Sequence, residues 1–202
     1  MTESKRPSRD LREACLAEAL AVIASDGVEK LSLREVARRL GVSHQAPYKH
    51  FPSRDHILAG VVARAFADFA AYLDRCLAGG DPAIELEAMG QAYLDYASAH
   101  PLEYRLMFGT PLPEPEAHPE MMRQARHAFA LLCEGLRRKA EAEGLALSDE
   151  EVNRDAMFIW SGLHGFAAIS TSTILGSLGF EPHHMQAARA HLFCAIGKAL
   201  KP

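Results

Sequence analysis

The stretch 31-LSLREVARRLGVSHQAPYKHFPSRD-55 holds the local signals that decide the fold of this chain. Ser32 precedes Glu35 by three residues, the spacing of a capping box in which each residue satisfies the other's backbone amide. A short apolar pattern of helical period follows and ends at Gly41, a residue that tolerates the left-handed conformation of a tight turn. Ser43 is then placed to cap a second short helix. The stretch predicts two short helices joined by a glycine turn.

Pro47 argues against the second of these helices, because proline has no amide hydrogen to donate. With Ser43 as the N-cap, however, Pro47 is the fifth residue, and only the carbonyl of Ser43 loses its partner. The cost is then below the roughly 3 kcal/mol of a proline in a helix interior. We therefore expect a helix over residues 43–51, clamped by Val42 and Phe51.

Two short helices joined by a glycine turn are typical of the helix-turn-helix motif, whose second helix enters the major groove of DNA. Gln45 can pair with adenine, His44 can donate to guanine and Ala46 can contact a thymine methyl group. The candidates for phosphate contacts are Ser32, Arg34, Ser43, Tyr48, Lys49, His50 and Arg54. A generic three-helix cluster with a polar face would show much of the same pattern, so these residues alone leave DNA binding open.

The charge distribution favours a polyanionic partner for the N-terminal part of the chain only. Residues 1–60 hold 10 Lys and Arg against 8 Asp and Glu, whereas the whole chain of 202 residues holds 22 against 26. A mildly basic head on an acidic body suits a nucleic-acid partner for the head.

The rest of the chain is predicted to be helical, because apolar residues recur at helical spacing and no segment alternates strictly. Asp81-Pro82 and the capping-box pair Ser148 and Glu151 mark helix starts, and Gly27, Gly144 and His100-Pro101 mark ends. We expect an all-α protein of about nine helices, with a three-helix helix-turn-helix head and a C-terminal helical bundle. We place the DNA-binding domain at residues 1–58 and an effector-binding and dimerisation domain at residues 59–202.

Residues 156–180 contain no Asp, Glu, Lys or Arg, and they exceed the roughly 20 residues that cross a bilayer. Their Ser, Thr, His and Gly residues favour instead a helix buried in a bundle or a subunit interface. The polar N-terminus has no apolar core of a signal peptide, and four widely spaced cysteines suit reduced thiols. We expect a cytoplasmic protein that makes no membrane contact.

Residues 31–61 closely resemble the tetracycline-repressor (TetR) family of bacterial transcription regulators. The matching residues are Gly41, Val42, Ser43, Tyr48, His50 and Phe51. Pro47 departs from the pattern, since most members carry Leu or Ile there. Farther on, 96-YASAHPLEYRLMFG-109 and 160-WSGLHG-165 resemble the effector domain of a subset named for its Trp-His-Gly residues, here Trp160, His164 and Gly165.

The resemblance implies a sequence-specific transcription regulator that binds a palindromic double-stranded DNA operator as a homodimer. It implies dimerisation through the last two long helices, and a small-molecule effector that releases a repressor from DNA. The body offers apolar and aromatic residues for the effector pocket, with Tyr93, Tyr104, Met107, Phe108, Phe129, Trp160 and His164 as candidates. The same side chains at helical spacing are equally typical of an ordinary core. The identity of the effector stays open, and no other cofactor is expected.

Other functions are not supported by motifs. His183, His184 and His191 lack the spacing of metal ligands, so no metal site is expected. An all-α enzyme using the same pocket is the first alternative, but the chain has no G-x-S-x-G, H-E-x-x-H or phosphate-loop motif. A DNA architectural protein without sequence preference is the second.

Overall fold

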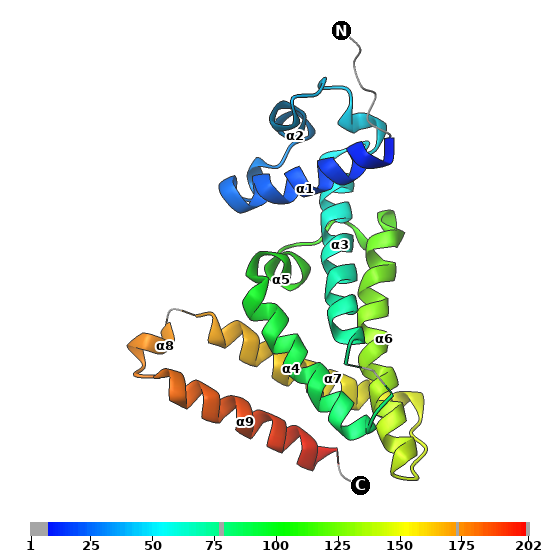
Figure 1. The fold of residues 1–202 in the computed structure, drawn as a ribbon, viewed down its shortest axis with the longest axis vertical. Coiled ribbons are helices and arrows are strands. Elements are labelled where there is room, and N and C mark those ends of the chain that lie inside the picture. The colour runs from blue at the N-terminus through cyan, green and yellow to red at the C-terminus, as the bar shows by residue number, and fades with distance from the viewer. Residues whose placement is uncertain (1–7, 77–78, 173, 201–202) are drawn as a thin grey trace. The chain divides into compact units, whose positions relative to one another are not determined.

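The computed structural model describes residues 8–76, 79–172 and 174–200, and over these residues the chain is helical without any strand. The α-helices are α1 (Ser8–Asp26), α2 (Leu33–Leu40), α3 (Arg54–Asp74), α4 (Pro82–Ala99), α5 (Pro101–Phe108), α6 (Pro119–Ala142), α7 (Asp149–Ser170), α8 (Ile174–Ser177) and α9 (Pro182–Ala199). Three 3₁₀ turns join them, namely η1 (Val28–Lys30), η2 (Pro47–Lys49) and η3 (Pro115–Ala117) (Figure 1). The predicted all-α class is confirmed.

The chain forms two compact units. The first consists of Met1–Asp68 with Leu102–Arg126, and the second of Phe69–Pro101 with His127–Pro202. Helices α3 and α6 each contribute residues to both units. The division of function at residues 58 and 59 stays a prediction, because compactness does not report which residues bind DNA or an effector.

The first unit is built on the inner stripe of α1, which packs against α2 and η2. Cys15, Ala19 and Val22, spaced three and four residues apart, are all fully buried, as the apolar pattern predicts for one face of a helix. Val36 and Ala37 of α2 are buried to the same extent. This core holds the turn between α2 and η2 in place.

Capping residues set the helix boundaries largely as the sequence predicts. The Ser32 hydroxyl accepts from the amide of Glu35 at 3.1 Å, and Gly41 is left-handed with φ 66°. The reciprocal half of this capping box is wrong, because the Glu35 carboxylate binds arginine side chains instead. In the second box both halves form: the Glu151 carboxylate accepts from the Ser148 amide at 2.8 Å, and the Ser148 hydroxyl accepts from the Glu151 amide at 3.3 Å.

The second unit contains α4, α7 and α9, with α7 in contact with both of the others, as Figure 1 shows. Close packing of α4 requires Gly90, since a Cβ atom there would lie 2.6 Å from Cε1 of Phe193 and 3.7 Å from Leu163. At Gly162 of α7 an added Cβ atom would lie 3.4 Å from Leu192, an ordinary packing distance. The absence of a side chain at Gly90 thus lets Phe193 of α9 pack directly on α4.

One helix of the described chain, α3, is long and apolar enough to cross a membrane by length and composition. Because 61% of its apolar window is buried inside the protein, it is a core helix. The uncharged residues 156–180 do not form one long helix, because α7 ends at Ser170 and the four-residue α8 follows.

Candidate functional site

The segment that follows the Gly41 turn is not the α-helix that the sequence predicts. Its residues form a turn over 44–46 and then η2, and the Ser43 carbonyl accepts from the Ala46 amide at 2.9 Å. The amides of His50 and Phe51 both donate to the Pro47 carbonyl at 2.9 Å. Since Pro47 has no amide hydrogen for the Ser43 carbonyl, the chain tightens and uses the preceding amide instead.

Pro47 also belongs to the core of the first unit. It is among the largest side chains with less than 2% exposure, and Phe51 is 2% exposed. The intervening Tyr48 is 43% exposed, so the segment is anchored by two apolar residues and presents its polar ones. A proline suits this place because it fills apolar space without a donor that burial would leave unsatisfied.

Four of the predicted DNA-binding residues surround a single open hollow of about 480 Å³. Arg34 comes from the first turn of α2, and His44, Gln45 and Tyr48 come from the turn and η2. All four are exposed. The structure therefore brings two predicted phosphate ligands, Arg34 and Tyr48, next to the two side chains predicted to read bases.

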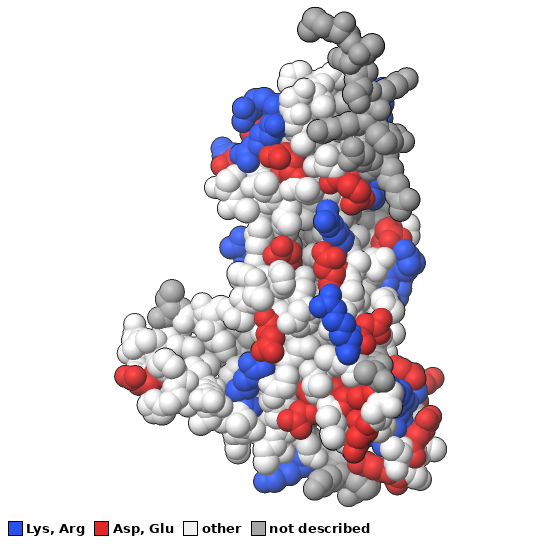
Figure 2. Space-filling model, viewed as in Figure 1, with Lys and Arg blue, Asp and Glu red and all other residues white. Residues whose placement is uncertain are grey.

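Four cations of the head, Arg34, Lys49, Arg38 and Arg39, fall into two groups. Arg34 and Lys49 are exposed, and within the described residues neither takes part in an ion pair. Arg38 and Arg39 instead bind Glu35 at 2.6 and 2.8 Å, and Arg39 also binds Asp26. These hydrogen bonds, first that of Arg38, lower the pKa of Glu35 to about 2. Lys and Arg gather over α2 in Figure 2, and those at positions 38 and 39 tie α2 together and to the end of α1.

Arg54, predicted to contact phosphate, serves the fold. Its Nη2 donates to the carbonyl of Val28 at 2.6 Å and its Nε to the carbonyl of Leu31 at 3.2 Å. Its Nη1 lies 3.4 Å from Asp55. Because these bonds satisfy the carbonyls around η1, we leave Arg54 out of the proposed DNA surface.

The other predicted head residues, which do not line the hollow, vary in exposure. Ser43 is exposed, Ala46 is half-buried, and the Ser32 hydroxyl is used as the cap of α2. The His50 ring meets Phe51 edge to face at 6.4 Å between centroids. Sequence reasoning missed one contact, the Arg12 guanidinium 5.5 Å from the Phe51 ring centroid, which joins α1 to this segment.

The predicted effector residues divide between the two units. Tyr104, Met107 and Phe108 lie in the first unit, where Met107 is buried and the Tyr104 and Phe108 rings are 5.1 Å apart. A second ring contact there joins Phe66 to Phe108 at 5.7 Å.

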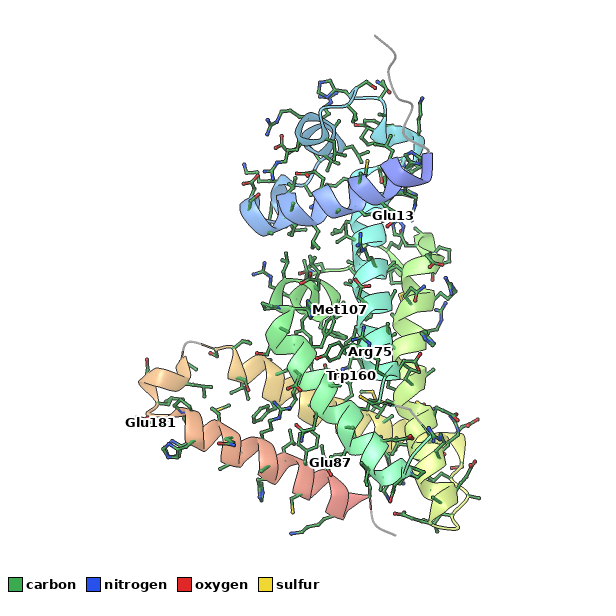
Figure 3. All side chains as sticks on the ribbon, viewed as in Figure 1. Glu13, Arg75, Glu87, Met107, Trp160 and Glu181 are labelled. Carbon is green, nitrogen blue, oxygen red and sulfur yellow. The ribbon has the colours of Figure 1, made fainter. Side chains whose placement is uncertain are left out.

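In the second unit, Tyr93 of α4 lies between two polar rings of α7. Trp160 Nε1 donates to Tyr93 Oη at 3.2 Å, and Tyr93 Oη lies 3.3 Å from His164 Nδ1. Phe129 of α6 approaches Trp160 to 6.0 Å, and Phe69 approaches Tyr93 to 5.4 Å. Trp160 is labelled in Figure 3. We call Tyr93, Trp160 and His164 the Tyr-Trp-His network.

One of the two histidines in the first turn of α9, His184, caps the helix. His184 Nδ1 accepts from the amide of Glu181 at 3.0 Å, and the rings of His183 and His184 are 3.9 Å apart. In the described part of the chain, no three His, Cys, Asp or Glu side chains group as metal ligands would.

The sequence of this chain matches two family models of bacterial regulators. The family model described as tetracyclin repressor-like, C-terminal domain, matches residues 86–193, more than half of the chain. The model of bacterial regulatory proteins of the tetR family matches residues 16–61, which include the hollow.

Individual proteins agree with these matches. The chain is 27% identical over 173 residues to the uncharacterised HTH-type transcriptional regulator Rv0681 of Mycobacterium tuberculosis, covering 86% of this chain and 76% of that one. It is 37% identical over 82 residues to the HTH-type transcriptional repressor KstR of Mycolicibacterium smegmatis, covering 40% of each. A solved protein of unknown function from Rhodococcus sp. RHA1 superposes with a TM-score of 0.74 at 27% identity, over 96% of this chain and 98% of that one. The chain spans 51% of the length of three further mycobacterial regulators that it matches.

Proposed function

Because this chain belongs to the tetracycline-repressor family of DNA-binding transcription regulators, we propose that it represses transcription as a homodimer on a palindromic operator until a small-molecule effector releases it. The observation that carries the proposal is the hollow lined by Arg34, His44, Gln45 and Tyr48. It places exposed donors of His44, Gln45 and Tyr48 on the segment that a helix-turn-helix protein presents to the major groove. Beside them lies Arg34 of α2, which forms no ion pair with any described residue.

Each residue around the hollow has a proposed role. Gln45 and His44 read base edges, since an amide pairs with adenine and an imidazole can donate to guanine. Arg34 and Lys49 supply the positive charge that draws the head to phosphate. The hydroxyl groups of Tyr48 and Ser43 donate hydrogen bonds to phosphate oxygens of the DNA backbone. Further backbone contacts come from His50 and Ser32, and Ala46 contacts a thymine methyl group.

The homodimer is supported by the exposed apolar side chains of α7. Met157, Phe158 and Ile169 of α7 are exposed by 48%, 49% and 56%. Between them lies Gly165, where an added Cβ atom would meet no atom within 4 Å. The region of α8 and α9 carries few charged side chains on the face drawn in Figure 2. An exposed apolar face with small residues at its centre suits a second copy of the same helices.

Two such heads in a symmetric dimer would present reading turns to successive major grooves about 34–36 Å apart, which explains the palindrome in the proposal. The repressor KstR, which is 37% identical to this chain over 82 residues, supports repression as the sign of regulation. The relatives are transcription regulators, which supports a cytoplasmic regulator over an all-α enzyme.

The Tyr-Trp-His network supports an effector site of the Trp-His-Gly type in the second unit. It combines aromatic surface with hydrogen-bonding groups, as small-molecule sites do. An effector acts only through its different affinity for the two states of the protein. A coupling of about 1–3 kcal/mol would change operator affinity roughly 5–150-fold. Helix α3, which has residues in both units, is the continuous element along which the change would reach the head.

Selection of operators from random double-stranded DNA by the purified full-length protein tests this function. We expect a palindromic consensus, with affinity for it far above that for random DNA at moderate salt. Equal affinity for all sequences would favour the architectural alternative, and a monomer on the selected DNA would contradict the homodimer.

A further inference from the structure

We propose that Arg189 of α9 is a positioning residue for the Tyr-Trp-His network: it holds α4 in the register that places Tyr93 between Trp160 and His164. The positioning is a property of the second unit alone. Its regulatory meaning rests on the proposed function, which makes the network the effector site and α9 a dimerisation helix.

Arg189 binds α4 at three points. Its Nε donates to Oε1 of Gln91 at 2.7 Å, and its Nη2 donates to the carbonyl of Gln91 at 3.3 Å and to Oδ1 of Asp95 at 2.8 Å. Gln91 and Asp95 are four residues apart and therefore share one face of α4. The planar guanidinium therefore binds α4 both before and after residue 93 in the sequence. A single hydrogen bond would not fix the rotation and the axial position of the helix in this way.

Tyr93 leaves α4 on another side, where it is 6% exposed. Its hydroxyl accepts from Trp160, a residue that can only donate, and lies 3.3 Å from Nδ1 of His164. Helix α4 is thus bound by α9 through residues 91 and 95 and by α7 through residue 93.

An apolar contact strengthens the grip of α9. Phe193, one turn after Arg189, packs directly on Gly90, the residue before Gln91. Since this contact leaves no space for a side chain on Gly90, α4 cannot turn or slide against α9 without breaking it. A displacement of about 1 Å would also take the Tyr93 hydroxyl out of hydrogen-bonding range of its two partners.

The inner side of α9 therefore fixes the position of Tyr93 in the network through its contacts with α4. The outer side of α9 is exposed and can contact a partner. Under the proposed function, dimer formation and effector binding are linked through Arg189. Such linkage is reciprocal, so an effector that changes the network would also change the stability of the dimer.

Trp160 is the only tryptophan of the chain, so its fluorescence reads the network directly in the full-length protein. We expect Arg189→Ala to shift the Trp160 emission in the same direction as Tyr93→Phe, which removes the hydroxyl acceptor. Arg189→Lys keeps the charge without the fork and should shift emission by a smaller amount. Helix content by circular dichroism should stay that of the wild type.

The matched control is Arg154→Ala, because Arg154 lies on the same helix as Trp160 and pairs with Asp155. This variant should leave the emission unchanged. In the double variant of Arg189→Ala and Tyr93→Phe, the shift should equal that of Tyr93→Phe alone, since both act on one hydroxyl. Wild-type emission from both Arg189 variants, or additive shifts in the double variant, would overturn the proposal.

Sedimentation separates this inference from the proposed function. A dimer that dissociates more readily in Arg189→Ala than in the wild type supports the link to α9. A wild-type protein that is monomeric at all concentrations would contradict the homodimer, and the emission of the Arg189 variants would still decide the positioning role.

Discussion

The carbonyl oxygen of Ser43 accepts the amide hydrogen of Ala46 at 2.9 Å, one residue earlier than an α-helix would supply its donor. The next amide belongs to proline and has no hydrogen, so the presumed reading helix is a turn followed by the 3₁₀ turn η2. The buried ring of Pro47 anchors this turn and leaves His44 and Gln45 exposed beside Arg34.

We expect Pro47→Ala to lower the free energy of unfolding by about 1–2 kcal/mol, because it removes buried apolar atoms and loosens the unfolded chain. Thermal and urea unfolding followed by circular dichroism measure the change. Pro52→Ala is the matched control, since Pro52 is exposed a few residues away. Equal effects of the two substitutions would contradict the core role of Pro47.

Gln45→Ala and Lys49→Ala should weaken DNA binding in different ways. Loss of Gln45 should cost about 1–3 kcal/mol on the selected operator and relax the preference at one base pair. Loss of Lys49 should weaken binding to all sequences alike and reduce the salt slope by about one. Titrations of selected and random DNA at several salt concentrations measure both effects. A uniform loss from Gln45→Ala would remove it from the base-reading residues.

Arg54→Ala and Arg34→Ala form a second pair. Arg54→Ala should lower the free energy of unfolding by about 1–2 kcal/mol, because it removes the charged hydrogen bonds to the Val28 and Leu31 carbonyls. The loss should be no larger, since these bonds are partly exposed to solvent. Arg34→Ala should leave stability near the wild type and weaken operator binding. Chemical unfolding and gel-shift titration of both variants check the assignment. The reverse outcome would return Arg54 to the DNA surface.

Gly90→Ala should destabilise the second unit by about 1–3 kcal/mol, because its methyl group would displace Phe193. Gly197→Ala in α9 should instead be neutral or stabilising by up to about 1 kcal/mol, since no atom lies near the added Cβ atom and alanine favours the helix. Unfolding curves of the two variants, one in α4 and the other in α9, test the contact between Gly90 and Phe193. A tolerated Gly90→Ala would show that Phe193 yields without cost.

Acid should weaken the α2 region through Glu35. Hydrogen bonds from Arg38 and Arg39 lower its pKa from 4.5 to about 2. A depressed folded-state pKa adds stability above the ordinary value, and this stability is lost as the pH falls towards 2. Glu35→Gln should therefore be less stable than the wild type at neutral pH, with the difference vanishing near the lower value. Urea midpoints across this range measure it. Glu29→Gln, at an exposed position of η1, is the matched control variant.

The helical class, most helix boundaries and the position of the head were predictable from the sequence. Ser32, Gly41, Ser148 and Glu151 act on atoms within a few residues of themselves, so their effects can be seen in the local sequence. The residues around the hollow could be named for the same reason, since all of them lie within fifteen positions of one another, from 34 to 48.

Tertiary packing decided the rest. The sequence predicts Arg54 as a phosphate ligand, but only the tertiary structure shows its hydrogen bonds to carbonyls 23 and 26 residues away. Trp160 and His164 meet Tyr93 across 67 and 71 residues, and Arg189 reaches Gln91 across 98. Helical periodicity shows which face of a helix is apolar, but not which neighbour that face meets. Only the close packing of α4, α7 and α9 around their glycines made that choice.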